Sequence, residues 1–162
     1  MSAIFSPCRT WRYALTREWE SPLGDGEELS CLFVCLNPST ADEIDDDPTV
    51  RRCIGYAKAW GYSKLTVCNI FALRSTDPKA LYTHADPVGP ENLAHIAREA
   101  VRHELIVAAW GNHGELRGQG VTVRNLLEVL AESVHVLGLN LDGQPKHPLY
   151  LRADIEPVQL WP

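Results

Sequence analysis

The fold is most clearly indicated by LFVCLNPSTAD, residues 32–42. An apolar run from Leu32 to Leu36 stops at Asn37-Pro38, and an acidic segment follows. Because the run is continuous rather than alternating, it predicts a strand that is buried on both faces. Pro38 cannot donate to a sheet ladder, so the strand must end there. Open α/β sheets build their sites just beyond the carboxyl ends of such strands. The polar residues from Asn37 onward are therefore the first candidates for chemistry.

The bulk properties of the chain narrow its class. It has 162 residues and a net charge of −6. This length suits one domain with a proper core, and we expect a single α/β domain over 1–162. The negative charge argues against broad nucleic-acid binding through a basic coat, although it leaves room for a local basic groove. With no apolar run of bilayer length and no signal peptide, we expect a cytoplasmic protein without a membrane partner.

The cysteines and the known cofactor motifs narrow the chemistry. The five cysteines are scattered, and Cys31, Cys35 and Cys68 fall within apolar runs. This pattern favours small core residues in a reducing compartment over a disulfide or metal framework. Phosphate-binding glycine loops, dinucleotide fingerprints, nucleophile elbows and zinc-protease helices are missing from the sequence. We therefore expect neither a cofactor nor a resident metal.

Local patterns predict strands that alternate with helices. Asp47-Pro48 is typical of a helix start, with Asp as the cap and Pro at the first helical position. The expected strands are at about 9–19, 29–36, 65–71, 104–110 and 134–137, and the expected helices at about 48–60, 91–103 and 121–132. A turn is expected at 21–26, one helical turn at 79–82, a loop at 111–114 and a final extended piece at 154–161. This alternation predicts right-handed crossovers in a mainly parallel sheet with helices on both faces.

In such a sheet the loops that follow the strands converge on one edge. Polar residues fall in four of these loops: Asn37-Pro38-Ser39-Thr40, Asn69 with Arg74, Asn112-His113, and Lys146-His147. Asn37 and Asn69 each close an apolar run, and a buried amide must find partners. They either fix their own loops or contact a ligand, and their occurrence as a pair favours a site. His147 lies between Pro145 and Pro148, which stiffen its loop, so it is either a surface histidine or a proton donor held in place.

The acidic stretch Asp42–Asp47 allows two interpretations. Its oxygens could bind a hard cation, but the glycine and distal glutamate of an EF-hand loop are missing. Alternatively, one aspartate caps the following helix and the others face solvent, since negative charge is favourable at a helix start.

Several motifs together resemble a bacterial and phage family of unknown function, DUF1643. They are Leu36–Asp42, Asp47–Cys53, Asn69–Arg74, Asp86–Asn92, Ala109–Gly111 and His147–Leu151. The resemblance extends over nearly the whole chain. It brings no established activity with it.

A more distant resemblance is to the uracil-DNA glycosylase superfamily. Cys35–Ser39 is similar to its G-x-N-P-G type motif, Val67–Asn69 to a second strand that ends in Asn, and Lys146–Leu149 to its late H-P-S-P-L loop. The resemblance implies a three-layer α/β/α sandwich with a mainly parallel four-stranded central sheet, to which this chain adds an N-terminal strand. By the same resemblance, Asn37 would position the attacking water, Asn69 would bind the base edge, and His147 would stabilise the departing base.

Three functional hypotheses follow from these residues. The first is an N-glycosidase acting on a nucleobase in DNA or in a nucleotide, with Asn37 and His147 as catalytic residues. Its substrate site would be lined by Pro38, Ser39, Asn69, Arg74, Asn112, His113 and Lys146. The second is a non-catalytic module that binds a nucleotide or modified base, because Ser39 stands where the glycosylase pattern has glycine and the chain is acidic. The third, a metal-dependent enzyme, would use Asp42–Asp47 with His113 or His147.

Overall fold

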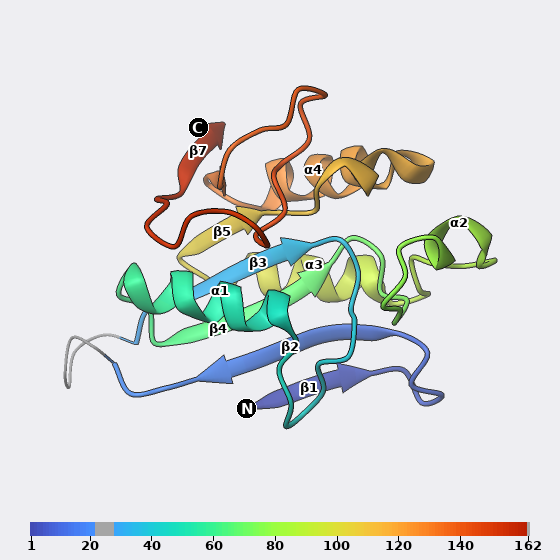
Figure 1. Ribbon diagram of the computed structural model, residues 1–162, viewed down its shortest axis with the longest axis horizontal. Coiled ribbons are helices and arrows are strands. Elements are labelled where there is room, and N and C mark those ends of the chain that lie inside the picture. The colour runs from blue at the N-terminus through green and yellow to red at the C-terminus, as the bar shows by residue number, and fades with distance from the viewer. Residues whose placement is uncertain (22–27, 162) are drawn as a thin grey trace.

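The computed structural model describes residues 1–21 and 28–161 and contains one seven-stranded sheet with helices on both faces (Figure 1). Its strands are β1 Ser2–Phe5, β2 Arg12–Glu18, β3 Ser30–Cys35, β4 Lys64–Asn69, β5 Leu105–Ala108, β6 Val134–Val136 and β7 Val158–Trp161. Its helices are α1 Pro48–Ala59, α2 Ala80–Thr83, α3 Asn92–Ala100 and α4 Gln119–Leu130, with a 3₁₀ segment η1 at Asn112–Gly118. Apart from Ser21, the turn expected at 21–26 lies outside the described residues.

The strand order is β1-β2-β4-β3-β5-β6-β7. The four strands β4, β3, β5 and β6 run parallel to one another, whereas β1, β2 and β7 are antiparallel to their neighbours. The α/β class and the mainly parallel sheet are confirmed. The sequence predicted a four-stranded parallel sheet with one added N-terminal strand. The sheet has more strands than predicted, because three antiparallel strands extend it at its two edges.

The central strand β3 explains the layering. All six of its residues are buried, as the continuous apolar run predicts. Leu32 and Val34 pack with residues of α3 and α4, whereas Cys31 and Phe33 pack on the opposite face with residues of α1. Figure 1 shows α1 on one side of the sheet and α3 and α4 on the other.

The sequence pattern did not predict β1 or η1. β1 has alternately exposed and half-buried residues and forms because its backbone pairs with β2. A loop was expected at 111–114, but residues 112–114 belong to η1, in which Arg117 has a positive φ of 54° that interrupts the helical geometry. Four cysteines are buried and Cys8 is exposed, and all five are free thiols. No helix within the described residues is long and apolar enough to cross a membrane.

Candidate functional site

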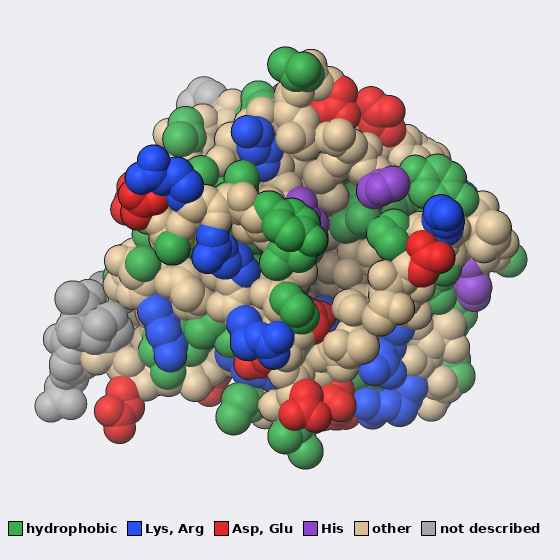
Figure 2. Space-filling view, in the orientation of Figure 1, with side chains coloured by type: hydrophobic (Ala, Val, Ile, Leu, Met, Phe, Trp, Pro, Cys, Tyr) green, Lys and Arg blue, Asp and Glu red, His purple; other side chains and the backbone are tan. Residues whose placement is uncertain are grey.

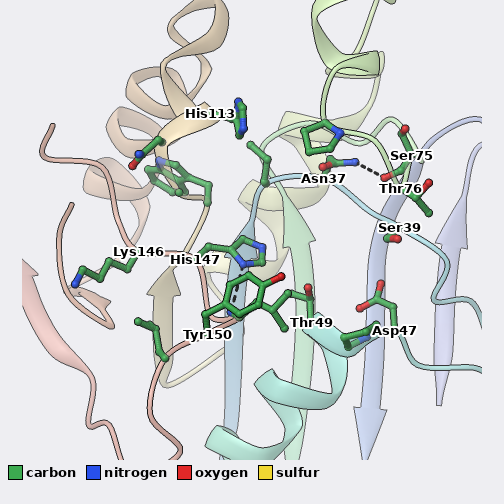
Figure 3. Close-up of a pocket in the computed structure, with 18 of the residues that line it drawn as sticks. Asn37, Ser39, Asp47, Thr49, Ser75, Thr76, His113, Lys146, His147 and Tyr150 are labelled. Atoms are coloured by element: carbon green, nitrogen blue, oxygen red, sulfur yellow. Dashed lines mark hydrogen bonds between the residues drawn. The ribbon is translucent and has the colours of Figure 1, made fainter. Parts of the chain in front are cut away.

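A cavity of about 760 Å³ opens at the carboxyl edge of the parallel strands. Its walls come from the segments after β3 and β5, the start of α1, the loop before α2 and the loop that follows β6. The residues that line it are Leu36, Asn37, Ser39, Asp47, Pro48, Thr49, Ser75, Thr76, Pro78, Trp110, Gly111, Asn112, His113, Asn140, Lys146, His147, Leu149, Tyr150 and Leu151. Figure 2 shows the molecule hollowed on this face, and Figure 3 shows the side chains around the hollow.

The strand order accounts for the position of this cavity. From β3 the chain crosses to β4 on one side, and it later returns to β5 on the other side of β3. The connections after β3 and β5 therefore leave the sheet in opposite directions, and open α/β sheets have their binding crevice at such a reversal. Leu36-Asn37 and Trp110-Gly111 are the residues on either side of it.

The two polar atoms of the Asn37 side chain, Nδ2 and Oδ1, differ in their hydrogen bonding. Its Nδ2 donates to the carbonyl oxygens of Pro38 at 3.1 Å and Ser75 at 2.9 Å, with a longer contact of 3.4 Å to Leu73. These bonds join the loop after β3 to the loop after β4. Its Oδ1 accepts no hydrogen bond from the described residues, so this oxygen is the part of the amide left for a ligand or a water.

His147 presents a defined tautomer to the cavity. The backbone N–H of Leu149 donates to its Nδ1 at 3.3 Å, so in the neutral ring the proton is on Nε2 (Figure 3). Burial lowers the pKa of His147 below the ordinary 6.5, and the nearby Asp47 carboxylate only partly opposes this. The imidazole is therefore neutral near neutral pH, with Nε2–H as its hydrogen-bond donor.

The loop that carries His147 is anchored on three sides. Gly111 N–H donates to the carbonyl of Pro145 at 2.8 Å, and Lys146 N–H donates to that of Gly138 at 2.9 Å. On the α1 side, the Tyr56 hydroxyl donates to the carbonyl of Arg152 at 2.9 Å. Gly111 has a φ of 73°, and a Cβ there would lie 3.4 Å from the Cβ of His147. Glycine thus lets the β5 loop adopt a left-handed conformation directly against the histidine.

Asp47 brings a buried carboxylate to the cavity. As predicted, it caps α1, and its Oδ1 accepts a hydrogen bond from Val50 N–H at 2.9 Å. Its Oδ2 has no hydrogen-bond partner among the described residues, although the whole residue is only 5% exposed. The sequence pattern identified the cap, but it did not reveal that the start of α1 is also a wall of the cavity.

Tyr150, which borders the cavity, has an unusual backbone conformation and a highly exposed side chain. It has a positive φ of 73°, which is rare for an aromatic residue, and it is 95% exposed. Strained backbone of this kind clusters at binding sites. An exposed ring beside a cavity can cover a planar ligand. Its only sequence signal is its position within the His147–Leu151 motif, which the pattern did not single out as a site residue.

The structure brings together six of the predicted site residues. Asn37, Ser39, Asn112, His113, Lys146 and His147 all line the cavity. Asn112 and His113 are exposed, and His113 Nδ1 lies 2.8 Å from the Tyr82 hydroxyl. The buried Pro38 is not part of the wall, and its carbonyl accepts hydrogen bonds from Asn37 and Ser75. Arg74 lies in an adjacent depression rather than in the cavity itself.

Asn69 does not reach the cavity, in contrast to the expected contact with a base edge. Its Oδ1 accepts a hydrogen bond from Nη2 of the buried Arg12 at 3.3 Å, and its carbonyl accepts one from Asn92 at 2.8 Å. β4 lies between β2 and β3, on the side of β3 away from the crevice. The Asn69 side chain therefore accepts a hydrogen bond from Arg12 of β2 instead of facing the cavity. The interpretation of Asn69 as a residue that fixes its own surroundings agrees with this geometry.

The acidic stretch 42–47 is used mainly for internal bonding. Asp42 accepts hydrogen bonds from the amides of Ile44 and Asp45, Glu43 pairs with Arg9 at 2.8 Å, and Asp46 pairs with the buried Arg17 at 2.8 Å. No group of three metal-ligating side chains occurs within 1–21 and 28–161. The donor set of the acidic stretch therefore does not fit a metal site.

Comparison with known proteins identifies the family of the chain. The model of the family described as "Protein of unknown function (DUF1643)" matches residues 12–149, which include most of the cavity wall. The chain belongs to the DUF1643 family. It matches no curated protein and no solved structure. Membership in DUF1643 confirms the first resemblance seen in the sequence, whereas the glycosylase resemblance stays a hypothesis about function.

Proposed function

We propose that the cavity binds the base of a nucleobase-containing molecule and that the protein hydrolyses the N-glycosidic bond of that molecule. The observation that carries the proposal is the neutral Nε2–H donor of His147 at a crevice shared with the Asn37 oxygen and the Asp47 carboxylate. Hydrolysis of this bond needs a donor for the departing base and acceptors that orient a water. The glycosylase resemblance of Asn37 and His147 gives the same assignment.

The dimensions and lining of the cavity suit a base. A volume of about 760 Å³ is within the usual range for small-molecule sites. Leu36, Trp110 and Leu149 supply apolar wall, and the exposed Tyr150 ring is available for stacking on a planar heterocycle. Thr49 adds a hydroxyl group that can pair with the polar edge of the base.

The proposed reaction assigns one role to each group. The bond between the sugar C1′ and the base nitrogen breaks, and its electron pair leaves with the base. His147 Nε2–H donates a hydrogen bond to the anion that develops on the base, which then takes a proton from solvent. Asn37 Oδ1 orients a water whose oxygen forms the new bond to C1′, and the Asp47 carboxylate accepts the proton that this water loses.

Free base released from substrate tests this function. The panel contains DNA with uracil, hydroxymethyluracil or a mismatched base, together with free nucleotides, and the product is quantified by chromatography. We expect release from at least one substrate, and a loss of about 100- to 1000-fold in rate for His147→Ala, as for other deleted anion-stabilising donors. His84→Ala is the matched control, because His84 lies outside the cavity wall. Release that is unchanged in His147→Ala would contradict the assigned mechanism.

A non-catalytic binding module is the second candidate. It is favoured by Ser39 at the position where the glycosylase pattern has glycine, and by Asn69, which is not among the described residues that line the cavity. In that case calorimetry would detect binding of a nucleotide or modified base, while the same ligand would remain intact after prolonged incubation. We further propose a cytoplasmic location, which suits the five free thiols.

A further inference from the structure

A second depression, of about 450 Å³, adjoins the cavity. It is lined by Arg9, Thr10, Ser39, Thr40, Arg74, Ser75 and Thr76. Three of these residues, Ser39, Ser75 and Thr76, also line the main cavity. The two hollows therefore share a wall, and one ligand could extend from the first into the second.

The lining of this depression has the chemistry of an anion site. It contains two guanidinium groups and five hydroxyl-bearing residues, and no carboxylate is part of the wall. The Ser75 hydroxyl is engaged with the backbone of Asp77 at 2.9 Å. The hydroxyl groups of Ser39, Thr40 and Thr76, in contrast, make no hydrogen bond with the part of the chain that the structure describes. Hydroxyl and guanidinium donors together are what phosphate oxygens require.

The two arginines of the depression differ in how their charge is used. Arg9 forms a bidentate pair with Glu43, at 2.8 and 3.0 Å, which neutralises it. Arg74 has no carboxylate partner within ion-pair distance among residues 1–21 and 28–161. Within the described part of the chain, its Nη1 makes only a long 3.4 Å contact with the carbonyl of Arg9, and its Nε is buried without a hydrogen-bond partner.

Arg74 is nevertheless held in place. Its guanidinium carbon lies 4.9 Å from the centre of the Phe5 ring, and its backbone N–H donates to the carbonyl of Thr10 at 3.0 Å. Stacking on an aromatic ring fixes the plane of a guanidinium group, and Arg74 Nη2 makes no hydrogen bond with the described residues. Figure 2 shows basic side chains over the turn that joins β1 to β2, the two strands labelled in Figure 1.

We propose that this depression binds a phosphate group of the ligand whose base occupies the cavity, with Arg74 as the main contact. This inference rests on the proposed function and deepens it, because it identifies the ligand as a phosphorylated species rather than a free base or nucleoside. The hydroxyl groups of Ser39, Thr40 and Thr76 complete the site. An isolated phosphate site of this kind is compatible with the net charge of −6, since it needs no basic coat.

Binding of inorganic phosphate, which carries no base, tests the phosphate subsite independently of the base cavity. In ¹⁵N-edited NMR, titration with phosphate at constant ionic strength should shift the Nε–H signal of Arg74 to a saturating value. Arg74→Gln should weaken phosphate binding by about fivefold or more, as expected for the loss of a charge-assisted contact. Arg98→Gln is the matched control, because it removes the same charge from the exposed surface of α3. A signal that does not saturate, or equal affinity in Arg74→Gln, would overturn the proposal.

A second arm separates this proposal from the proposed function. For a nucleoside that binds the cavity, a 5′-phosphate should tighten binding by about tenfold in the native protein and have little effect in Arg74→Gln. If phosphate binds at Arg74 while no nucleoside binds, the base-binding function fails and the subsite stands. If nucleosides bind and the phosphate adds nothing, the subsite fails alone. A short single-stranded oligonucleotide, compared with the mononucleotide, shows which phosphorylated species is preferred.

Discussion

At the scale of single residues, the site depends on which atom of a side chain is already used. Asn37 donates its Nδ2–H groups to three backbone carbonyls, and its oxygen has no partner among the described residues. His147 keeps Nε2–H free because the Leu149 amide holds Nδ1. The sequence predicted that both residues would lie at strand-end loops. It could not predict these partners, because Leu73 and Ser75 belong to a different loop from Asn37.

The tautomer of His147 predicts a pH dependence. Burial lowers the pKa of His147, so the neutral donor form persists to a pH below 6.5 and is lost as the pH falls through the lowered pKa. Protonation at Nδ1 removes the acceptor of the Leu149 N–H and so breaks the hydrogen bond that orients the ring, and we therefore expect the rate of base release to fall on the acidic side of that pKa. In His147→Gln, which keeps an N–H donor but does not titrate, the acidic limb attributed to this ring should disappear. Rate measurements between about pH 4 and pH 8 check this. An identical acidic limb in both proteins would mean that another group titrates.

Gly114 gives a prediction about packing beside the cavity. A Cβ at this position would overlap Trp110 Cδ1, and Trp110 is part of the cavity wall. We expect Gly114→Ala to lower the free energy of unfolding by about 1–3 kcal/mol, the usual cost of overpacking. Gly55→Ala is the control, because nothing lies within 4 Å of the position its Cβ would take, and alanine in α1 should stabilise by about 0.5–1 kcal/mol. Urea denaturation distinguishes them. Equal stabilities would show that Trp110 moves aside freely.

At the scale of elements, sequence patterns identified most strands and helices. α1 begins at Pro48 with Asp47 as its cap, as the Asp-Pro pair predicts, and β3 and β5 fall within the expected buried runs. The antiparallel edge strand β1 was missed, because its stability comes from backbone pairing with β2 rather than from its own apolar pattern. The position of Asn69 was also beyond prediction. It depends on the strand order, which places β4 next to β2, and on the buried Arg12 that crosses from β2 to Asn69.

Asp47 allows its helix-capping role to be separated from its proposed catalytic role. Asn is as good an N-cap as Asp, so Asp47→Asn should leave the free energy of unfolding almost unchanged. The same variant removes the carboxylate proposed to accept a proton, and base release should fall strongly. Asp47→Ala should lose both, with a stability cost of about 1 kcal/mol for the missing cap. Thermal denaturation and base release, measured on both variants, check this. An active Asp47→Asn would exclude the carboxylate from the reaction.

Across the whole molecule, the carboxyl and amino ends of the parallel strands differ in function. The cavity lies at the carboxyl edge, whereas a hydrogen-bonded cluster lies at the amino edge, where β3 and β5 begin. There, His103 Nδ1 lies 2.9 Å from the Ser30 hydroxyl, and its Nε2 lies 3.3 Å from Glu99. None of these three residues lines the cavity, so we expect this cluster to support stability alone.

This cluster predicts acid sensitivity. The hydrogen bond from His103 lowers the pKa of Glu99 below the ordinary 4.5. The stability that depends on the ionised carboxylate is thus fully present above 4.5 and is lost as the pH falls through the lowered pKa. Glu99→Gln should be less stable by about 1–2 kcal/mol near neutral pH, and the difference should shrink under acid. Denaturant unfolding at several pH values measures this, and base release should be unaffected. A constant difference at all pH values would contradict the role of the charge.

In the proposed mechanism, His147 offers a neutral Nε2–H donor to a base in the cavity. Two-dimensional NMR of protein labelled with ¹⁵N-histidine tests both parts together, because ring nitrogen shifts report the tautomer and the ligand contact. We expect a neutral Nε2–H ring for His147 near neutral pH, and a shift of that nitrogen when at least one nucleotide of a panel covering the common and modified bases is added. A protonated ring, or a His147 signal that no nucleotide moves, would contradict it.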